Sequence, residues 1–171
     1  MTSDELREIQ APFKAKYKAS PETAVIHSCV TGALLLDHPA CRIDTLQGPV
    51  VAGMHPAVGG DGSEACSIDI LLEALVGCAG LTFNLVATAM GIPFNDVKIK
   101  VHGASDIRGA LGINKEVPVG VTHIRLHFEV DSPATDEQVA LLVKQTERYC
   151  MVYQTLLQPP VIETYVSRTD V

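Results

Sequence analysis

Cys78 and Cys150 are the residues of this sequence best suited to chemistry. A cysteine thiolate is a nucleophile, and two thiols that approach each other can form a disulfide. Each cysteine lies in a long apolar segment, one within residues 68–90 and the other within residues 135–157. If the helices predicted for these segments cross, the thiols meet as an attacking and a resolving pair. A buried cysteine taken alone is more often core packing.

A reactive Cys78 needs a group that stabilises its thiolate. It lies eleven residues past Ser67, the predicted N-cap, which is roughly 16 Å along the helix axis. The helix dipole acts only over the first turn, so it cannot lower the pKa of this thiol. The helical neighbours of Cys78 are apolar and include Leu75, with Thr82 as the one hydroxyl, and such a wall suits an apolar substrate. A positive group must therefore come from elsewhere in the fold.

Composition and charge exclude several classes of protein. Of the 171 residues, 47% are hydrophobic and 19% are charged, which is typical of a single globular domain rather than a disordered chain. The net charge of −7 argues against a nucleic-acid partner and against binding to anionic membranes. Residues 1–10 are polar and acidic and do not form a signal peptide, so we expect a cytoplasmic protein.

The five cysteines form no metal-binding or disulfide framework by spacing. Their number is odd, no CxxC pair occurs, and the sequence predicts neither a metal site nor a cofactor. His123 and His127 lie on one predicted strand about 13 Å apart, which is too far to share a metal ion. Inert buried thiols and reactive thiols both remain possible at this point.

Hydrophobic periodicity predicts alternating helices and strands. Residues 1–20 read as an amphipathic N-terminal helix with an apolar stripe, and residues 48–66 read as a loop rich in glycine and proline. The other predicted helices are residues 68–90 and 135–157. The predicted strands are residues 24–36, 41–46, 97–103, 121–130 and 161–166. Without regular βαβ alternation, this order predicts an α+β domain with a mainly antiparallel sheet, spanning residues 1–171.

The predicted helix 68–90 is apolar nearly all round, so one sheet cannot cover it. Its 17 uncharged residues are long enough for a transmembrane helix, but Asn84 and several small polar residues interrupt them. We therefore expect this helix to be buried inside protein. Gly77 and Gly80 leave room for another helix to approach closely. We expect that partner to be the helix 135–157 or a second subunit.

The two cysteine contexts together resemble the OsmC/Ohr family of hydroperoxide-reducing proteins. The similar segments are LLEALVGCAGLTFNLVATAMGI, VKIKVHG and ERYCMVYQTL, with the two cysteines 72 residues apart. The resemblance covers residues from about 25 to the C-terminus. It implies an intertwined homodimer in which mainly antiparallel sheets wrap two long central helices.

The resemblance also implies a cysteine peroxidase that protects against oxidative stress. The Cys78 thiolate attacks an organic hydroperoxide, an alcohol leaves, and Cys150 resolves the sulfenic acid as a disulfide. A dithiol, possibly a dihydrolipoyl group, then reduces the pair.

Three positions depart from the family pattern around the thiol. Ile68 replaces a glutamate that holds an activating arginine, no arginine occurs in residues 48–66, and Met151 stands where proline is frequent after the second cysteine.

Arg42 is our first candidate for the activating cation, and Asp69 is the candidate carboxylate to hold it. His55 is the second candidate and a possible substrate-binding donor, and Arg148 is the third. An alternative reading is a non-catalytic dimer that senses oxidants or binds an apolar ligand.

Overall fold

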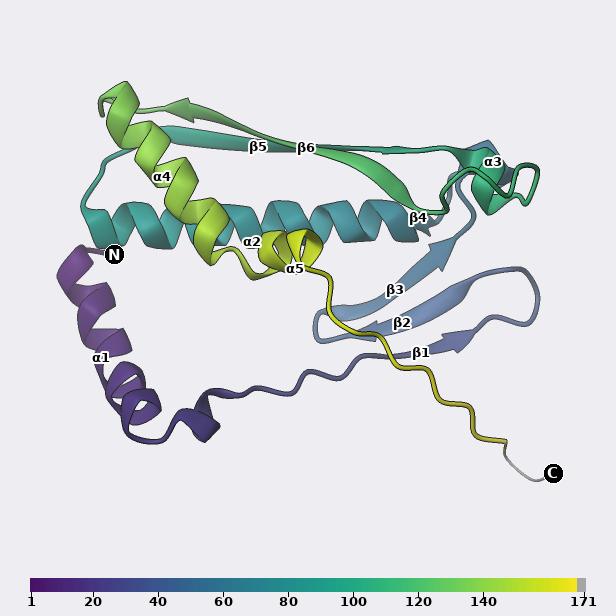
Figure 1. Ribbon diagram of the computed structural model, residues 1–171, viewed down its shortest axis with the longest axis horizontal. Coiled ribbons are helices and arrows are strands. Elements are labelled where there is room, and N and C mark those ends of the chain that lie inside the picture. The colour runs from purple at the N-terminus through teal and green to yellow at the C-terminus, as the bar shows by residue number, and fades with distance from the viewer. Residues whose placement is uncertain (169–171) are drawn as a thin grey trace.

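A 24-residue helix, α2 (Ser67–Met90), runs through the centre of the structure, a computed structural model that describes residues 1–168 (Figure 1). Its N-cap is Cys66, one residue before the predicted Ser67, because Ser67 already has helical backbone. Gly91 ends it with a φ of 64°, a left-handed conformation that favours glycine. By length and composition alone α2 could span a membrane, but in this fold it packs against other elements of the chain. These include α1 (Ser3–Ala19), β4 (Ala65–Cys66), β5 (Asp96–Ser105), α4 (Asp136–Tyr149) and α5 (Met151–Leu157).

One side of α2 is covered by the hairpin of β5 (Asp96–Ser105) and β6 (Val121–Asp131). The predicted alternation along both strands is confirmed, since every second side chain turns toward α2. The buried residues of α2 on this side are Leu75, Ala79, Phe83 and Ala87. Phe83 stacks on Phe128 of β6, with ring centroids 5.6 Å apart. A short helix, α3 (Ile107–Ala110), lies between the two strands in the chain.

A second sheet contains four strands in the order β1-β2-β3-β4. Its members are β1 (Thr31–Leu34), β2 (Cys41–Thr45), β3 (Gly48–Gly53) and β4 (Ala65–Cys66), antiparallel except for the β3–β4 pair. The mainly antiparallel α+β class is therefore confirmed.

Two sequence predictions for this region were wrong. Residues 24–36 do not form one strand. Ala24 ends a 3₁₀ helix that begins at Pro21, and only residues 31–34 pair as β1. Residues 48–66 are not all loop, since they contain β3, β4 and a 3₁₀ helix at Pro56–Val58. Gly48, at φ 118°, follows the tight turn that lets Gly48–Ala52 pair back on β2.

The predicted helix 135–157 is broken, which corrects its prediction as one element. It consists of α4 (Asp136–Tyr149) and α5 (Met151–Leu157), with Cys150 between them in an extended conformation (φ −71°, ψ 108°). Cys150 therefore lies at a helix boundary and not in mid-helix. Both α4 and α5 pack on α2.

The predicted last strand, residues 161–166, is absent from the structure. Residues 158–168 have no regular secondary structure, and the side chains of Val161, Ile162, Tyr165 and Val166 are exposed. The alternation and β-propensity of a segment do not suffice for a strand, because a strand needs a neighbour to bond with.

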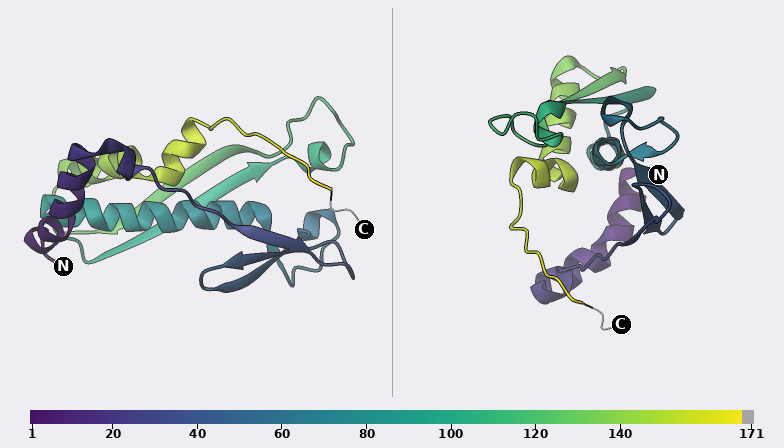
Figure 2. Two further views of the ribbon diagram at one scale, coloured as in Figure 1. Left: turned by 90° about the horizontal axis from the view of Figure 1, so that it is seen from below. Right: turned by 90° about the vertical axis from the view of Figure 1, so that its right-hand side faces the viewer.

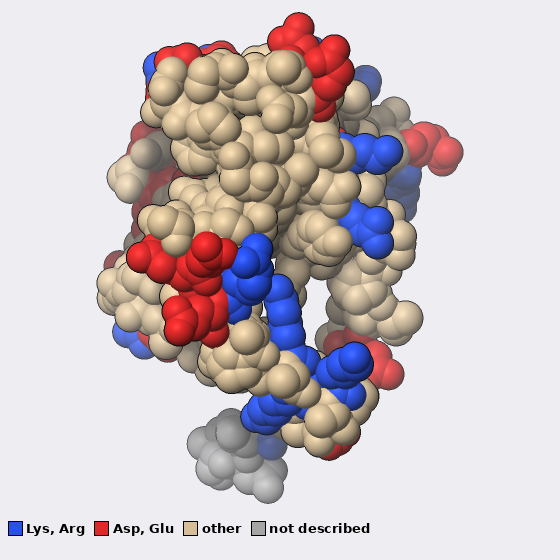
Figure 3. Space-filling model, turned by 90° about the vertical axis from the view of Figure 1, so that its left-hand side faces the viewer, with Lys and Arg blue, Asp and Glu red and all other residues tan. Residues whose placement is uncertain are grey.

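The predicted N-terminal helix is present as α1 (Ser3–Ala19), with a capping box between Thr2 and Glu5. It contacts the C-terminal end of α2 and then leads away from the body (Figures 1 and 2). In the end-on view of Figure 2, α5 with the C-terminal segment lies on one side of the exposed face of α2, and α1 with the sheet β1–β4 lies on the other. The space-filling view of Figure 3 shows an opening between α1 and the rest of the molecule, which we call the concavity. The side of α2 opposite β5 and β6 is exposed, with Leu81 64% accessible.

Candidate active site

The structure brings Cys78 and Cys150 into contact. Because α5 packs on α2, the helix break at Cys150 lies against the middle of α2. Both thiols belong to one apolar cluster with Leu75, Ala79 and Tyr153, and neither forms a disulfide. Cys150 is only 1% exposed, whereas Cys78 is partly exposed at the edge of the open side of α2.

The break between α4 and α5 releases backbone donors from the helical ladder. In a continuous helix the N–H of Met151 would bond to the carbonyl of Glu147. Instead the side-chain amide of Gln154 donates to that carbonyl at 2.8 Å. The first N–H groups of α5 are therefore free, as at every helix N-terminus, and need another acceptor.

The sulfur of Cys78 lies close enough for these N–H groups to act on its pKa. Partial burial alone would raise the pKa of the Cys78 thiol, but hydrogen bonds to its sulfur outweigh this effect and lower the pKa below its ordinary value. The donors, from largest effect to smallest, are the N–H of Val152, the thiol of Cys150, the N–H of Met151 and the hydroxyl of Thr82.

Cys150 is shifted in the opposite direction. Burial raises the pKa of the Cys150 thiol, and the adjacent Cys78 sulfur raises it further, while the N–H groups of Tyr153 and Val152 only partly oppose the rise. Cys150 thus stays protonated when Cys78 ionises, and it donates to the thiolate. One thiol is prepared to attack and the other is kept as a neutral partner.

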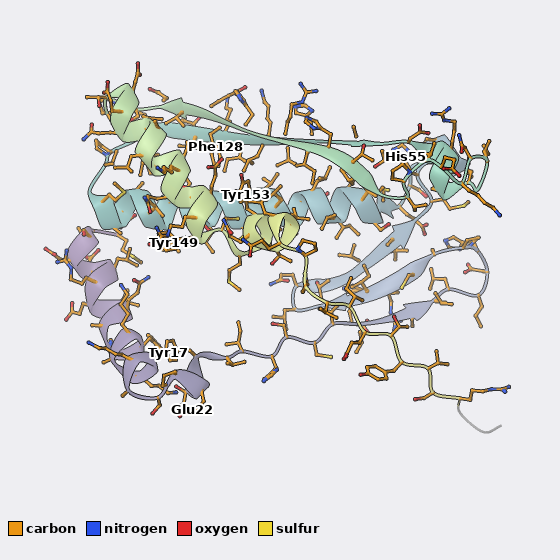
Figure 4. The ribbon with its side chains drawn as sticks, viewed as in Figure 1. Tyr17, Glu22, His55, Phe128, Tyr149 and Tyr153 are labelled. Carbon is orange, nitrogen blue, oxygen red and sulfur yellow. The ribbon has the colours of Figure 1, made fainter. Side chains whose placement is uncertain are left out.

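The walls around the pair are apolar, as predicted. Leu75 is fully buried beside the thiols, and the hydroxyl of Thr82 helps to lower the pKa of Cys78, so both predicted wall residues lie at the site. Beside the pair, a cavity of about 430 Å³ opens between α2, β6 and α5, and the ring of Tyr153 lines it (Figure 4). Burial, and then the nearby carboxylate of Glu147, raise the pKa of Tyr153. The residues lining the cavity are Leu75, Val121, Thr122, His123, Ile124, Leu126, Glu147, Tyr153, Leu156 and Leu157.

The structure does not bring the predicted cations to Cys78 within the described part of one chain. Arg42 lies on β2 and pairs with Asp44 at 3.3 Å. The ring of His55 accepts the N–H of Ala57 at 3.0 Å, far along the molecule from Tyr153 in Figure 4. Arg148 lies over the ring of its neighbour Tyr149, 5.5 Å from the centroid.

Asp69 is exposed in the first turn of α2, about 180° around the helix from Cys78. It therefore holds no cation at the thiol within this chain.

Sequence reasoning missed the backbone N–H groups of Met151 and Val152. It tested the dipole of the helix that carries Cys78 and did not consider the N-terminus of a different helix. A signal was present, because proline is favoured at the first position of a helix, and the resemblance places proline where this chain has Met151. That preference marks a helix start directly after the second cysteine.

Comparisons with known proteins agree with this arrangement of elements. A family model described as OsmC-like protein matches residues 60–165, whereas no curated protein sequence matches the chain. Among solved structures, an OsmC-like protein from Mycoplasma pneumoniae superposes with a TM-score of 0.66 at 21% identity, covering 78% of this chain and 89% of that one.

Two further structures share the fold at low identity. An organic hydroperoxide resistance protein OsmC from Legionella pneumophila has a TM-score of 0.62 at 13% identity, covering 78% of this chain and 91% of that one. The organic hydroperoxide resistance protein OhrB of Bacillus subtilis has a TM-score of 0.52 at 16% identity, covering 78% and 93%. The match over residues 60–165, which include both thiols and both elements that position them, shows that this chain belongs to the OsmC-like protein family.

Proposed function

We propose that the protein is a thiol-dependent peroxidase that reduces organic hydroperoxides to alcohols. The observation that carries the proposal is the unequal thiol pair: Cys78 has a lowered pKa and partial exposure, and Cys150 has a raised pKa and is buried against it. A peroxidase needs one ionised thiol that a peroxide can reach and one protected thiol within reach of the product. Family membership and structural similarity to organic hydroperoxide resistance proteins support the same class of chemistry.

The proposed reaction uses three balanced steps. The Cys78 thiolate attacks the distal peroxide oxygen, the O–O bond breaks, and the alkoxide leaves and takes a proton from water, so that Cys78 becomes a sulfenic acid. The Cys150 thiol displaces the sulfenic oxygen as water, forming the Cys78–Cys150 disulfide. A dithiol, for which the family resemblance implies a dihydrolipoyl group, reduces that disulfide and is itself oxidised. We place this cycle in the cytoplasm, where reducing dithiols are maintained.

The proposed substrate has an apolar body. The cluster around the thiols presents apolar side chains from α2, β5, β6 and α5, among them Val101, Leu126 and Leu156. An alkyl or aryl hydroperoxide removes its apolar surface from water on entering such a site, and hydrogen peroxide gains nothing from it.

We further propose that the active unit is a homodimer. The chain exposes 13003 Å² of surface, whereas a compact monomer of 18.3 kDa would expose roughly 8,100 Å². The excess is roughly 4,900 Å² per chain, more than each partner of a typical obligate dimer buries, as expected if extended segments of each chain wrap the other. Gly77 and Leu81 face the open side of α2, where a helix of a second copy covers the edge of Cys78. In such a dimer the partner is also the proposed source of an arginine equivalent to Arg42.

Stopped-flow oxidation of the reduced protein tests the peroxidase proposal. We expect rapid loss of about one thiol pair per chain with cumene hydroperoxide, slower reaction with hydrogen peroxide, and multiple turnovers when dihydrolipoamide is present. An oxidation rate that does not exceed the rate of free cysteine would reject the proposal.

A second function, oxidant sensing without turnover, is favoured by one observation. Among residues 1–168 no cation acts on the pKa of Cys78, and Ile68 occupies the position of the glutamate expected to hold one. A sensor would undergo the same single oxidation, but neither dihydrolipoamide nor any other dithiol would sustain cycling. The stopped-flow experiment therefore separates the two functions.

A further inference from the structure

The N-terminal helix α1 carries an apolar stripe that its own chain leaves uncovered. Leu6 is buried against the end of α2, but Ile9 and Phe13, on the same side of the helix, are each 54% exposed, and Tyr17 is also exposed. Phe13 and Tyr17 lie against each other, with ring centroids 6.3 Å apart. The stripe thus continues outward from a packed residue into solvent over three more positions.

The stripe faces the concavity beneath α2. In Figure 4 the ring of Tyr17 lies on the side of α1 turned toward the rest of the molecule. The space-filling view in Figure 3 shows an opening between this arm and the body. The arm is held at its N-terminal end, where Ser3 donates to the carbonyl of Ala89 in α2, and residues 20–30 connect its outer end to β1. It therefore borders a gap that no described segment of the same chain fills.

We propose that α1 is a clamp that packs its stripe of Ile9, Phe13 and Tyr17 on a second copy of this chain seated in the concavity. This inference rests on the proposed homodimer and goes beyond it, because α1 lies outside residues 60–165 that match the family model. The excess surface of roughly 4,900 Å² is large for one helix face, so the interface extends from the open side of α2 to its rim at α1.

The basic outer end of α1 is suited to an acidic occupant such as a second copy of this chain. The outer half of α1 carries Lys14, Lys16 and Lys18, visible as a basic patch at the lower end of the arm in Figure 3, whereas the whole chain has a net charge of −7. A second copy is therefore attracted to this end of the arm.

A matched pair of triple variants tests the clamp. The stripe variant changes Ile9, Phe13 and Tyr17 to serine, and the control changes Glu8, Ala11 and Ala15, on the opposite exposed side of α1, to serine. We expect sedimentation to give the stripe variant a dimer dissociation constant about tenfold or more above that of wild type. The dissociation constant of the control should lie within about twofold of wild type. Equal dissociation of the two variants would overturn the proposal.

Cross-linking identifies the occupant directly. A photoreactive phenylalanine at position 13, in a mixture of isotopically heavy and light protein, should give heavy–light peptides. Cross-links confined to one isotope, or binding of wild type to phosphatidylglycerol vesicles through the stripe, would contradict the clamp. Peroxide turnover on the same samples is a separate readout: a dimer without turnover rejects the peroxidase and leaves the clamp standing, and a monomeric wild type rejects the dimer and the clamp together.

Discussion

The two sides of the Cys78–Cys150 contact differ in the burial of the sulfur atom and in the hydrogen-bond donors around it. On the α2 side, Cys78 lies far from its own helix N-terminus and receives donors from another helix, so its pKa falls. At the α4–α5 break, Cys150 is buried and adjoins the ionisable Cys78, so its pKa rises. The reactivity of a thiol in this fold is therefore set by which free backbone groups point at it, and not by the helix that carries it.

Replacing Cys78 with serine should have the largest effect. We expect peroxide consumption to fall by about a thousandfold or more, because the hydroxyl does not ionise near neutral pH and oxygen is a poorer nucleophile toward peroxide. A coupled assay with dihydrolipoamide measures this. Appreciable turnover in Cys78→Ser would move the attacking role to another cysteine.

Replacing Cys150 with serine should separate the two halves of the cycle. The serine hydroxyl still donates toward Cys78, so we expect one oxidation at a rate within about tenfold of wild type, followed by arrest at sulfenic acid. Trapping with dimedone and mass spectrometry detects that acid. Continued cycling without it would show that Cys150 is not the resolving thiol.

Met151→Pro should weaken activation without removing either thiol. Proline suits the first position of α5 and the extended conformation of Cys150, but it lacks the N–H that bonds to Cys78. We expect the pKa of Cys78 to rise and single-turnover oxidation at neutral pH to slow by about tenfold. The control Met151→Ala keeps the N–H and should react like wild type. Equal slowing in both variants would attribute the effect to the methionine side chain.

Gln154→Leu should have a smaller effect through the same groups. Without the amide, the carbonyl of Glu147 has no donor, and the N–H of Met151 is drawn back toward it. We expect a few-fold slower oxidation and a loss of about 1 kcal/mol in the free energy of unfolding. Gln158→Leu, at an exposed position after α5, is the control. Unchanged oxidation in Gln154→Leu would show that the break holds its geometry without this bond.

The sequence predicted those parts of the fold that follow from local pattern. The alternation in β6 and the apolar run ended by Gly91 both identified their elements, because each pattern depends only on neighbouring residues. The break at Cys150 was missed because the helical hydrophobic period of residues 135–157 continues through the break. The break is stabilised by a hydrogen bond from the Gln154 side chain to the carbonyl of Glu147, which the hydrophobic period does not reveal. The strand predicted at residues 161–166 has no partner strand among residues 1–168, which the segment's own pattern does not reveal.

The same distinction between local pattern and three-dimensional contacts holds for the candidate site. Cys78, Cys150, Leu75 and Thr82 were identified from residue type and helical spacing, and the structure brings them together. The activating donors were not identified, because every residue carries a backbone N–H and only the three-dimensional path shows which are free. Arg42, His55 and Asp69 remain predictions for a site completed by a second copy.

The pH dependence of alkylation, resolved for each cysteine by mass spectrometry, tests the central claim most directly. The rate follows the thiolate fraction, so it rises as pH passes through the pKa of each thiol. We predict that alkylation of Cys78 is half-maximal below the free-thiol value of about 8.5 and that alkylation of Cys150 is half-maximal above it. A Cys78 midpoint at or above about 8.5, or the same midpoint for both cysteines, would contradict the account of an unequal, backbone-activated thiol pair.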